Sequence, residues 1–252
     1  MKLKIGFAGA RLLGSNCLKE VLKQPGLEIT AICFPKADEK VWWTDIIDEK
    51  EVKKLGFKIT PWPEWKELKF DLIFSVLHGK IFKPAHLENT RLGIINLHPA
   101  PLPQYRGCNS YSHAIMNGEK KYGVSLHYID EGIDTGDVIG INYLKIDEND
   151  TAYSLYQKAQ KEALRLFKTK LPQILAYAKQ GEKFPAKKQN NKRANYYPRT
   201  SLQDKEVKLS WPKIKIDRFV RGLDFPPFEP AYLNINGKKI YLTFSHNQTS
   251  GS

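Results

Sequence analysis

The chain has 252 residues, a formal net charge of +13 and 41% hydrophobic residues. This length allows one large domain, or one domain with a smaller appendix, around a sizeable core, and it excludes a disordered chain. No run of 18 apolar residues is present and residues 1–7 lack a secretory layout, so we expect a cytoplasmic protein without membrane segments. The basic residues are spread over several segments, so a lysine-rich solvated surface is expected rather than nucleic-acid binding. Three cysteines lack metal-type spacing, and no metal site is predicted.

Apolar runs in the first third of the chain alternate with a helical stretch. Strands are predicted at residues 3–9, 29–34, 58–60 and 71–77, and a helix at residues 13–23. This alternation predicts an α/β fold with a Rossmann-like, doubly wound and mostly parallel sheet. The glycines of the first turn, from Gly6 to Gly14, have the wrong spacing for a dinucleotide fingerprint, so no nicotinamide cofactor is expected.

Two polar segments follow predicted strands further along the chain. The apolar run 92–95 ends in Asn96 and His98, where three prolines within five residues prevent further ladder pairing. Because strand side chains alternate, Asn96 and His98 point to the same side. A second strand, 122–129, breaks into an acidic, glycine-containing loop that carries Asp134. Loops at the carboxyl ends of strands are where open α/β sheets carry out chemistry.

These three side chains suit acyl transfer to an amine. Asn96 offers an N–H donor for the negative charge that develops on a carbonyl oxygen. His98, oriented or polarised by Asp134, can act as acid or base near neutral pH. Taken singly, each residue is as well explained as a turn former, a helix cap or a solvated side chain.

The two segments together resemble the formyltransferase superfamily that uses N10-formyltetrahydrofolate. The resemblance rests on Asn-Leu-His-Pro-x-Pro-Leu-Pro-x-Tyr-Arg-Gly at residues 96–107 and Asp-Glu-Gly-Ile-Asp-Thr-Gly-Asp at residues 130–137, and it covers roughly the first 180 residues. It implies that Asn96, His98 and Asp134 form the catalytic trio. It also implies a folate pocket formed by residues on three segments, namely Val76, Leu77, His78, Gly79, Ile81, Leu97, Asp130, Gly132 and Ile133.

The last hundred residues predict a helix, a linker and a small C-terminal segment. A helix begins at about Thr151, Pro172 kinks it or starts a new one, and Gly181 ends it. We therefore expect a catalytic domain at residues 1–182, a polar linker at 183–194 and a small C-terminal domain at 195–246. The last of these contains a helix at about 213–223 and a hairpin that turns at Asn236-Gly237.

The short C-terminal segment favours one branch of the superfamily. Methionyl-tRNA formyltransferases carry a larger C-terminal barrel and a basic insertion, whereas this layout resembles the nucleotide-sugar N-formyltransferases. The resemblance implies a homodimer that formylates a nucleotide-linked amino sugar, in particular dTDP-4-amino-4,6-dideoxyglucose, in O-antigen or other surface-polysaccharide biosynthesis. A methionyl-tRNA formyltransferase-like enzyme and a formyltetrahydrofolate hydrolase remain the alternatives.

A nucleotide-sugar site needs cations for the phosphates and aromatic faces for the base. The sequence offers nine candidates near the predicted strand ends and in the tail, namely Arg11, Lys80, Tyr105, Arg106, Tyr196, Tyr197, Arg199, Arg221 and Phe225.

Overall fold

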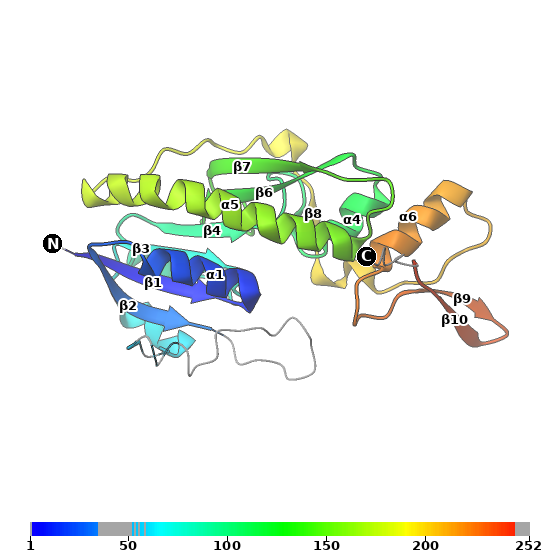
Figure 1. Cartoon of the computed structure of the whole chain (residues 1–252), viewed down its shortest axis with the longest axis horizontal. Helices are drawn as coiled ribbons and strands as arrows, with labels where there is room; N and C mark the ends of the chain where they lie inside the picture. The colour runs from blue at the N-terminus through cyan, green and yellow to red at the C-terminus, as the bar shows by residue number, and fades with distance from the viewer. Residues whose placement is uncertain (1, 35–51, 53, 55, 58, 245–252) are drawn as a thin grey trace, which may run out of the picture.

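A six-stranded sheet forms the centre of the molecule (Figure 1). The computed structural model describes residues 2–34, 52, 54, 56–57 and 59–244. The strand order is β2-β1-β3-β4-β6-β7, in which the first four strands are parallel and the last two pairings are antiparallel. The strands are β1 (Leu3–Gly9), β2 (Leu27–Cys33), β3 (Leu72–Val76), β4 (Ile94–His98), β6 (Lys121–Tyr128) and β7 (Val138–Lys145). The predicted α/β class with a mostly parallel sheet is confirmed.

Helices cover the two faces of the sheet unequally. Helices α1 (Arg11–Leu22) and α5 (Ala152–Lys179) lie together against one face, where most of the buried apolar side chains gather (Figure 1). The 3-10 helix η1 (Trp62–Glu67) and the short helix α3 (Pro84–Glu88) contribute to a smaller core on the other face.

The prediction and the structure differ at three elements. Ile59 makes an isolated parallel bridge to Ile32 where a short strand is predicted at 58–60, and residue 58 lies outside the described residues. Helix α5 continues through Pro172, so the alternative that this proline starts a new helix is wrong, because the apolar stripe of the helix is buried on both sides of the proline and compensates for the lost hydrogen bond. Strand β7 is absent from the prediction, since Gly140 and Asn142 interrupt its alternation.

The C-terminal part contains the predicted helix and hairpin. Helix α6 (Lys213–Leu223) packs on α4 (Ser110–Met116), and β9 (Ala231–Ile235) pairs with β10 (Lys238–Leu242). Asn236 and Gly237, at the turn of this hairpin, both have positive φ, as a tight two-residue turn requires. Two short strands, β5 (Arg106–Gly107) and β8 (Tyr196–Tyr197), pair in parallel next to the predicted site. In the described part of the chain, no helix is long and apolar enough to cross a membrane.

Candidate active site

Three polar side chains lie side by side because of the way β4 pairs with β6. The antiparallel register places Asn96 opposite His127 and His98 opposite Ser125. Alternate residues of β4, such as Leu97, belong to the core beneath α5, so Asn96 and His98 point to the opposite face. The amide nitrogen of Asn96 lies 3.1 Å from Nε2 of His127. Sequence reasoning found Asn96 and His98 but missed His127, although it is polar in a strand whose alternate residues are apolar.

Asp134 reaches this group from the loop between β6 and β7. Its Oδ1 lies 3.6 Å from Nδ1 of His98 and 3.6 Å from Nε2 of His127, while its Oδ2 accepts a hydrogen bond of 2.9 Å from the Gly107 amide. The side chains of both histidines and of Asp134 are largely buried. The predicted trio of Asn96, His98 and Asp134 is therefore brought together, and the buried His127 lies next to both Asn96 and Asp134.

The route of this loop differs from the one that the sequence indicates. The prediction treats both polar segments as leaving strands at the ligand-binding edge of a mostly parallel sheet. Strand β6 instead runs antiparallel to β4, and the amide of Ile129, just beyond β6, donates to the carbonyl of Ile94 at the start of β4. Asp134 meets His98 only because the loop at residues 129–137 folds back across the sheet.

The backbone fixes the tautomer of His98. Its Nε2 lies 3.1 Å from the carbonyl oxygen of Tyr105, which can only accept a hydrogen bond. Nε2 therefore carries a proton, and in the neutral ring Nδ1 is unprotonated and faces Asp134. Such a ring can take a proton at Nδ1 next to a carboxylate that stabilises the resulting imidazolium.

Two glycines allow the backbone to approach closely around Asp134. Gly107 has φ +88°, and a Cβ there would lie 2.4 Å from the carbonyl oxygen of Tyr197. A Cβ at Gly136 would lie 2.0 Å from the carbonyl oxygen of Tyr128. Both distances are too short for any side chain, so these turns require glycine.

Residues 185–197, here called the C-terminal strap, pack against the catalytic loops. Gln189 donates hydrogen bonds of 2.9 and 2.7 Å to the carbonyls of Asp134 and Gly136, and its Oε1 accepts two from the Arg106 guanidinium. The Arg106 side chain also donates to Asn191. The segment predicted as a linker therefore helps to hold the loop of Asp134, and Gln189 is a second residue that sequence reasoning missed. The division into domains stays a prediction.

The residues predicted to form the folate pocket lie in different surroundings. The side chains of Val76 and Leu97 are buried in the main core, on the face opposite the trio, so only their backbone can meet a ligand there. His78 is different, because both of its ring nitrogens are buried without a hydrogen-bond partner among the described residues. Its ring lies among those of Trp62 and Phe82.

The other predicted folate residues lie at or near the surface, except Leu77, which is half-buried. Ile81 is 72% exposed, and Gly79, Gly132 and Ile133 are also exposed. Asp130 is exposed as well, and its Oδ1 accepts hydrogen bonds from Thr135 and from the backbone of Gly132. Asp130 therefore shapes the catalytic loop.

Three of the predicted substrate ligands have other contacts in the structure. The Tyr105 ring is buried, stacks on Tyr197 and donates its hydroxyl to Glu119, so it offers no free face to a base. The guanidinium of Arg106 donates its hydrogen bonds to Gln189 and Asn191 of the strap. Arg221 is buried and donates to Asp217 and to the carbonyl of Asp150, just before α5, so its role is structural.

The remaining six lie in three places. Lys80 is exposed beyond β3, and Tyr196 and Arg199 are exposed on or just beyond the strap. Tyr197 is half-buried against the ring of His113. Arg11 and Phe225 both contact Tyr156, near the start of α5, through its hydroxyl and its ring respectively.

Burial sets the charge state of two histidines. It lowers the pKa of His127 to about 4, and the nearby Asp134 carboxylate only partly opposes this effect. It likewise lowers the pKa of His78 to about 4. Both rings are therefore neutral at pH 7. Among the residues that the structure describes, no group of three or more His, Cys, Asp or Glu side chains is arranged to hold a metal ion.

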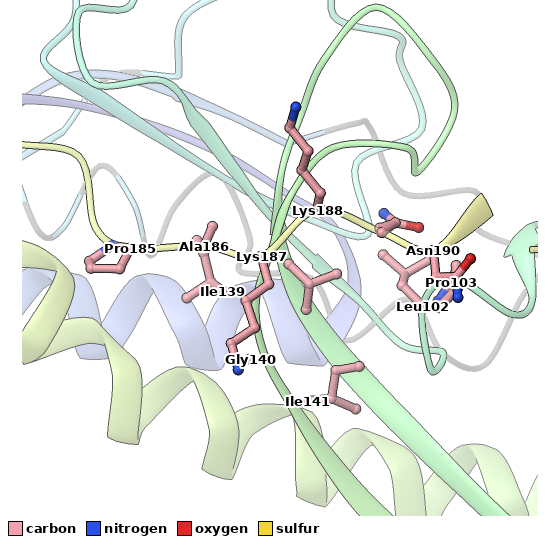
Figure 2. A pocket seen from close by; sticks show the side chains of 12 residues that line it. Leu102, Pro103, Ile139, Gly140, Ile141, Pro185, Ala186, Lys187, Lys188 and Asn190 are labelled. Atoms are coloured by element: carbon pink, nitrogen blue, oxygen red, sulfur yellow. The ribbon is translucent and has the colours of Figure 1, made fainter. Parts of the chain in front are cut away.

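A hollow of about 550 Å³ lies along the outer edge of the sheet, between β7 and residues 185–190 (Figure 2). Leu102 and Pro103 contribute to it from the loop after β4. Figure 2 shows Lys187 and Lys188 pointing to opposite sides of the strap. No member of the trio lines this hollow, so it is separate from the candidate catalytic group.

Comparison with known proteins agrees with this geometry. Residues 60–171, which include the trio, match the family described as formyl transferase. A GDP-perosamine N-formyltransferase of Brucella melitensis is 36% identical over 68% of this chain, and a methionyl-tRNA formyltransferase of Syntrophomonas wolfei is 34% identical over 70%. These matches span only 64% and 54% of the two relatives' own lengths.

A solved structure resembles nearly the whole chain. The N-formyltransferase from Helicobacter canadensis, in complex with folinic acid and dTDP-3-aminofucose, has a TM-score of 0.78 and 27% identity. The similarity covers 94% of this chain and 86% of that one. The chain belongs to the formyl transferase family.

Proposed function

We propose that the protein is an N-formyltransferase that moves a formyl group from N10-formyltetrahydrofolate to the amino group of a nucleotide-linked amino sugar. The observation that carries the proposal is the placement of His98 between a carbonyl oxygen and the Asp134 carboxylate, with the Asn96 amide on the same face. The similarity to proteins named as sugar N-formyltransferases supports the acceptor class.

Each member of the trio has one task in this reaction. As the amine attacks the formyl carbon, negative charge develops on the formyl oxygen, and the Asn96 amide donates a hydrogen bond to it. Nδ1 of His98 takes the proton that the amine loses, because Nε2 is already bonded to Tyr105. The imidazolium formed is stabilised by Asp134 and returns the proton to the departing nitrogen. The folate supplies the activated formyl group when bound.

The region after β3 fits a folate. Strands β3 and β4 are paired so that Val76 lies beside Leu97, which brings the segment after β3 next to the end of β4. His78, two residues beyond β3, has two buried ring nitrogens without a partner among the described residues, and a pterin edge can supply the missing hydrogen bonds. The rings of Trp62 and Phe82 add an apolar wall beside it.

The identity of the sugar is the finer part of the proposal. We infer dTDP-4-amino-4,6-dideoxyglucose as the acceptor and O-antigen or other surface-polysaccharide biosynthesis as the setting, in the cytoplasm. The named relatives act on or bind GDP-perosamine and dTDP-3-aminofucose, which carry different nucleotides, so both belong in any test.

A homodimer is also part of the proposal. The hairpin β9–β10 exposes apolar side chains, with Ile235, Ile240 and Tyr241 each about half exposed. A second copy that covers this hairpin would remove that surface from water. Sedimentation analysis of the wild type and of Ile240→Lys tests this, since a dimer that persists unchanged in the variant excludes the hairpin as the contact.

The deciding experiment measures turnover of N10-formyltetrahydrofolate with a panel of acceptors. The panel contains the three sugars named above, a UDP-linked amino sugar, methionyl-tRNA and no acceptor at all. Fast formylation of one sugar supports the proposal. Activity on methionyl-tRNA alone identifies a methionyl-tRNA formyltransferase-like enzyme, and formate release at full rate without acceptor identifies a hydrolase.

A further inference from the structure

His127 is one of the most deeply buried polar side chains around the trio. Its side chain is 1% exposed, and β-sheet register places it directly opposite Asn96. Its ring crosses that of His98 at nearly a right angle, with 6.1 Å between the centroids. His127 thus lies behind the trio, out of reach of solvent.

Its two ring nitrogens have distinct partners. Nδ1 lies 2.7 Å from the backbone carbonyl of Tyr128, which can only accept, so Nδ1 carries the proton. Burial keeps the ring neutral by lowering its pKa to about 4, and Nε2 is therefore unprotonated. The group 3.1 Å from this acceptor on Asn96 must then be the NH2 group and not the carbonyl oxygen.

We propose that His127 is a positioning residue that fixes the orientation of the Asn96 amide, so that an N–H and not the oxygen faces the formyl oxygen of the substrate. The effect of this orientation on catalysis rests on the proposed function, whereas the hydrogen bond between His127 and Asn96 does not. Asn96 is half-buried, and its nitrogen makes no other hydrogen bond within the described chain, so one N–H stays available for the reaction. Without His127, either end of the amide can face the substrate.

The alternative is that His127 affects catalysis through Asp134 and not through Asn96, because Nε2 of His127 also lies 3.6 Å from Oδ1 of Asp134. This distance is too long for a hydrogen bond, whereas 3.1 Å to Asn96 is within the usual range. The two paths predict different coupling between substitutions. A residue that acts through Asn96 loses its effect when Asn96 is absent, and one that acts through Asp134 does not.

The kinetic test compares His127→Leu, His127→Gln, Asn96→Ala and the double variant Asn96→Ala/His127→Leu. Removing an oxyanion donor lowers kcat by about 10²–10³, which is expected for Asn96→Ala. Because a small misplacement costs up to about 10²-fold, His127→Leu is expected to lower kcat tenfold to a hundredfold, with each KM within about twofold of wild type. His127→Gln places a carbonyl oxygen near the position of Nε2 and should recover most of the rate.

In the double variant, kcat should equal that of Asn96→Ala within about twofold, because His127 has nothing left to orient. Fully additive losses, or a His127→Gln variant as slow as His127→Leu, would overturn the proposal. Thermal unfolding of all four variants separates a rate effect from loss of the fold.

Nitrogen-15 NMR of the wild-type protein tests the hydrogen bond independently of any activity. The expected spectrum has a protonated Nδ1 and an unprotonated Nε2 in His127. A protonated Nε2 would mean that Asn96 presents its oxygen to the ring, which overturns the inference even if the enzyme is active. If the wild type formylates no acceptor, the proposed function fails, and this spectrum still decides whether His127 orients the amide.

Discussion

Replacing Asp134 with asparagine removes the negative charge next to His98 and changes little else. The carboxylate oxygen lies 3.6 Å from Nδ1 of His98, and both side chains are largely buried. At that distance an imidazolium and a carboxylate attract each other by about 4 kcal/mol at an effective dielectric constant of about 20. This stabilisation arises only when His98 is protonated during the reaction, so its loss should lower kcat by about a thousandfold.

The assay follows formyl transfer to the preferred acceptor under saturating conditions. The asparagine of the Asp134→Asn variant can still accept the 2.9 Å hydrogen bond from the Gly107 amide through its side-chain carbonyl oxygen, so the midpoint of thermal unfolding should move little. Glu131→Gln is the matched control, since it removes an exposed carboxylate from the same loop and should leave kcat unchanged. A loss below about threefold in Asp134→Asn, with the fold intact, would refute the role given to this charge.

Three further changes probe other parts of the site. Gly107→Ala should lower kcat at least about tenfold and reduce the melting temperature, because its Cβ would meet the Tyr197 carbonyl oxygen at 2.4 Å; unchanged kinetics would contradict this. The pKa of His127 is lowered from 6.5 to about 4, so the unfolded chain binds the extra proton and stability falls as pH drops from about 6.5 to 4. Between pH 7 and pH 5, the free energy of unfolding measured with urea should fall by about 2 kcal/mol less in His127→Gln than in the wild type. Equal decreases in the two proteins would refute the argument that burial lowers the pKa of His127. Arg221→Met should lower the free energy of unfolding by about 2–3 kcal/mol through the lost hydrogen bonds to Asp217 and leave each KM unchanged, whereas a raised KM at constant stability would restore Arg221 as a ligand.

The sequence predicted the parts of the fold that depend on local pattern. Alternating apolar runs and helical periodicity predicted β1, α1, β3 and the C-terminal hairpin, because each is amphipathic or bounded by glycine and proline. Strand direction is not a local property, and the antiparallel turn of β6 against β4 could not be read from residue spacing. This is why Asp134 was predicted at the site but the course of its loop was not.

The gaps in the predicted site have the same origin. His127 becomes adjacent to Asn96 only through sheet register, and Gln189 contacts the loop of Asp134 across more than fifty residues of chain. Conversely, Arg106 and Tyr105 lie next to the motif in sequence, yet their side chains are used by the strap and the core. Proximity in sequence therefore predicted which loops form the site, but it did not predict which side chains in those loops remain available to bind a ligand.

The C-terminal strap also determines when the protein can first work during its own synthesis. The strands of the central sheet all precede residue 146, whereas the hydrogen bonds from Gln189 and the pairing of Tyr196 and Tyr197 with β5 involve chain that leaves the ribosome later. A nascent chain that has already formed its sheet still lacks the contacts that hold Gly107 against Asp134. The proposed formyl transfer should therefore appear late and abruptly in a series of stalled chains of increasing length, only after the strap has emerged.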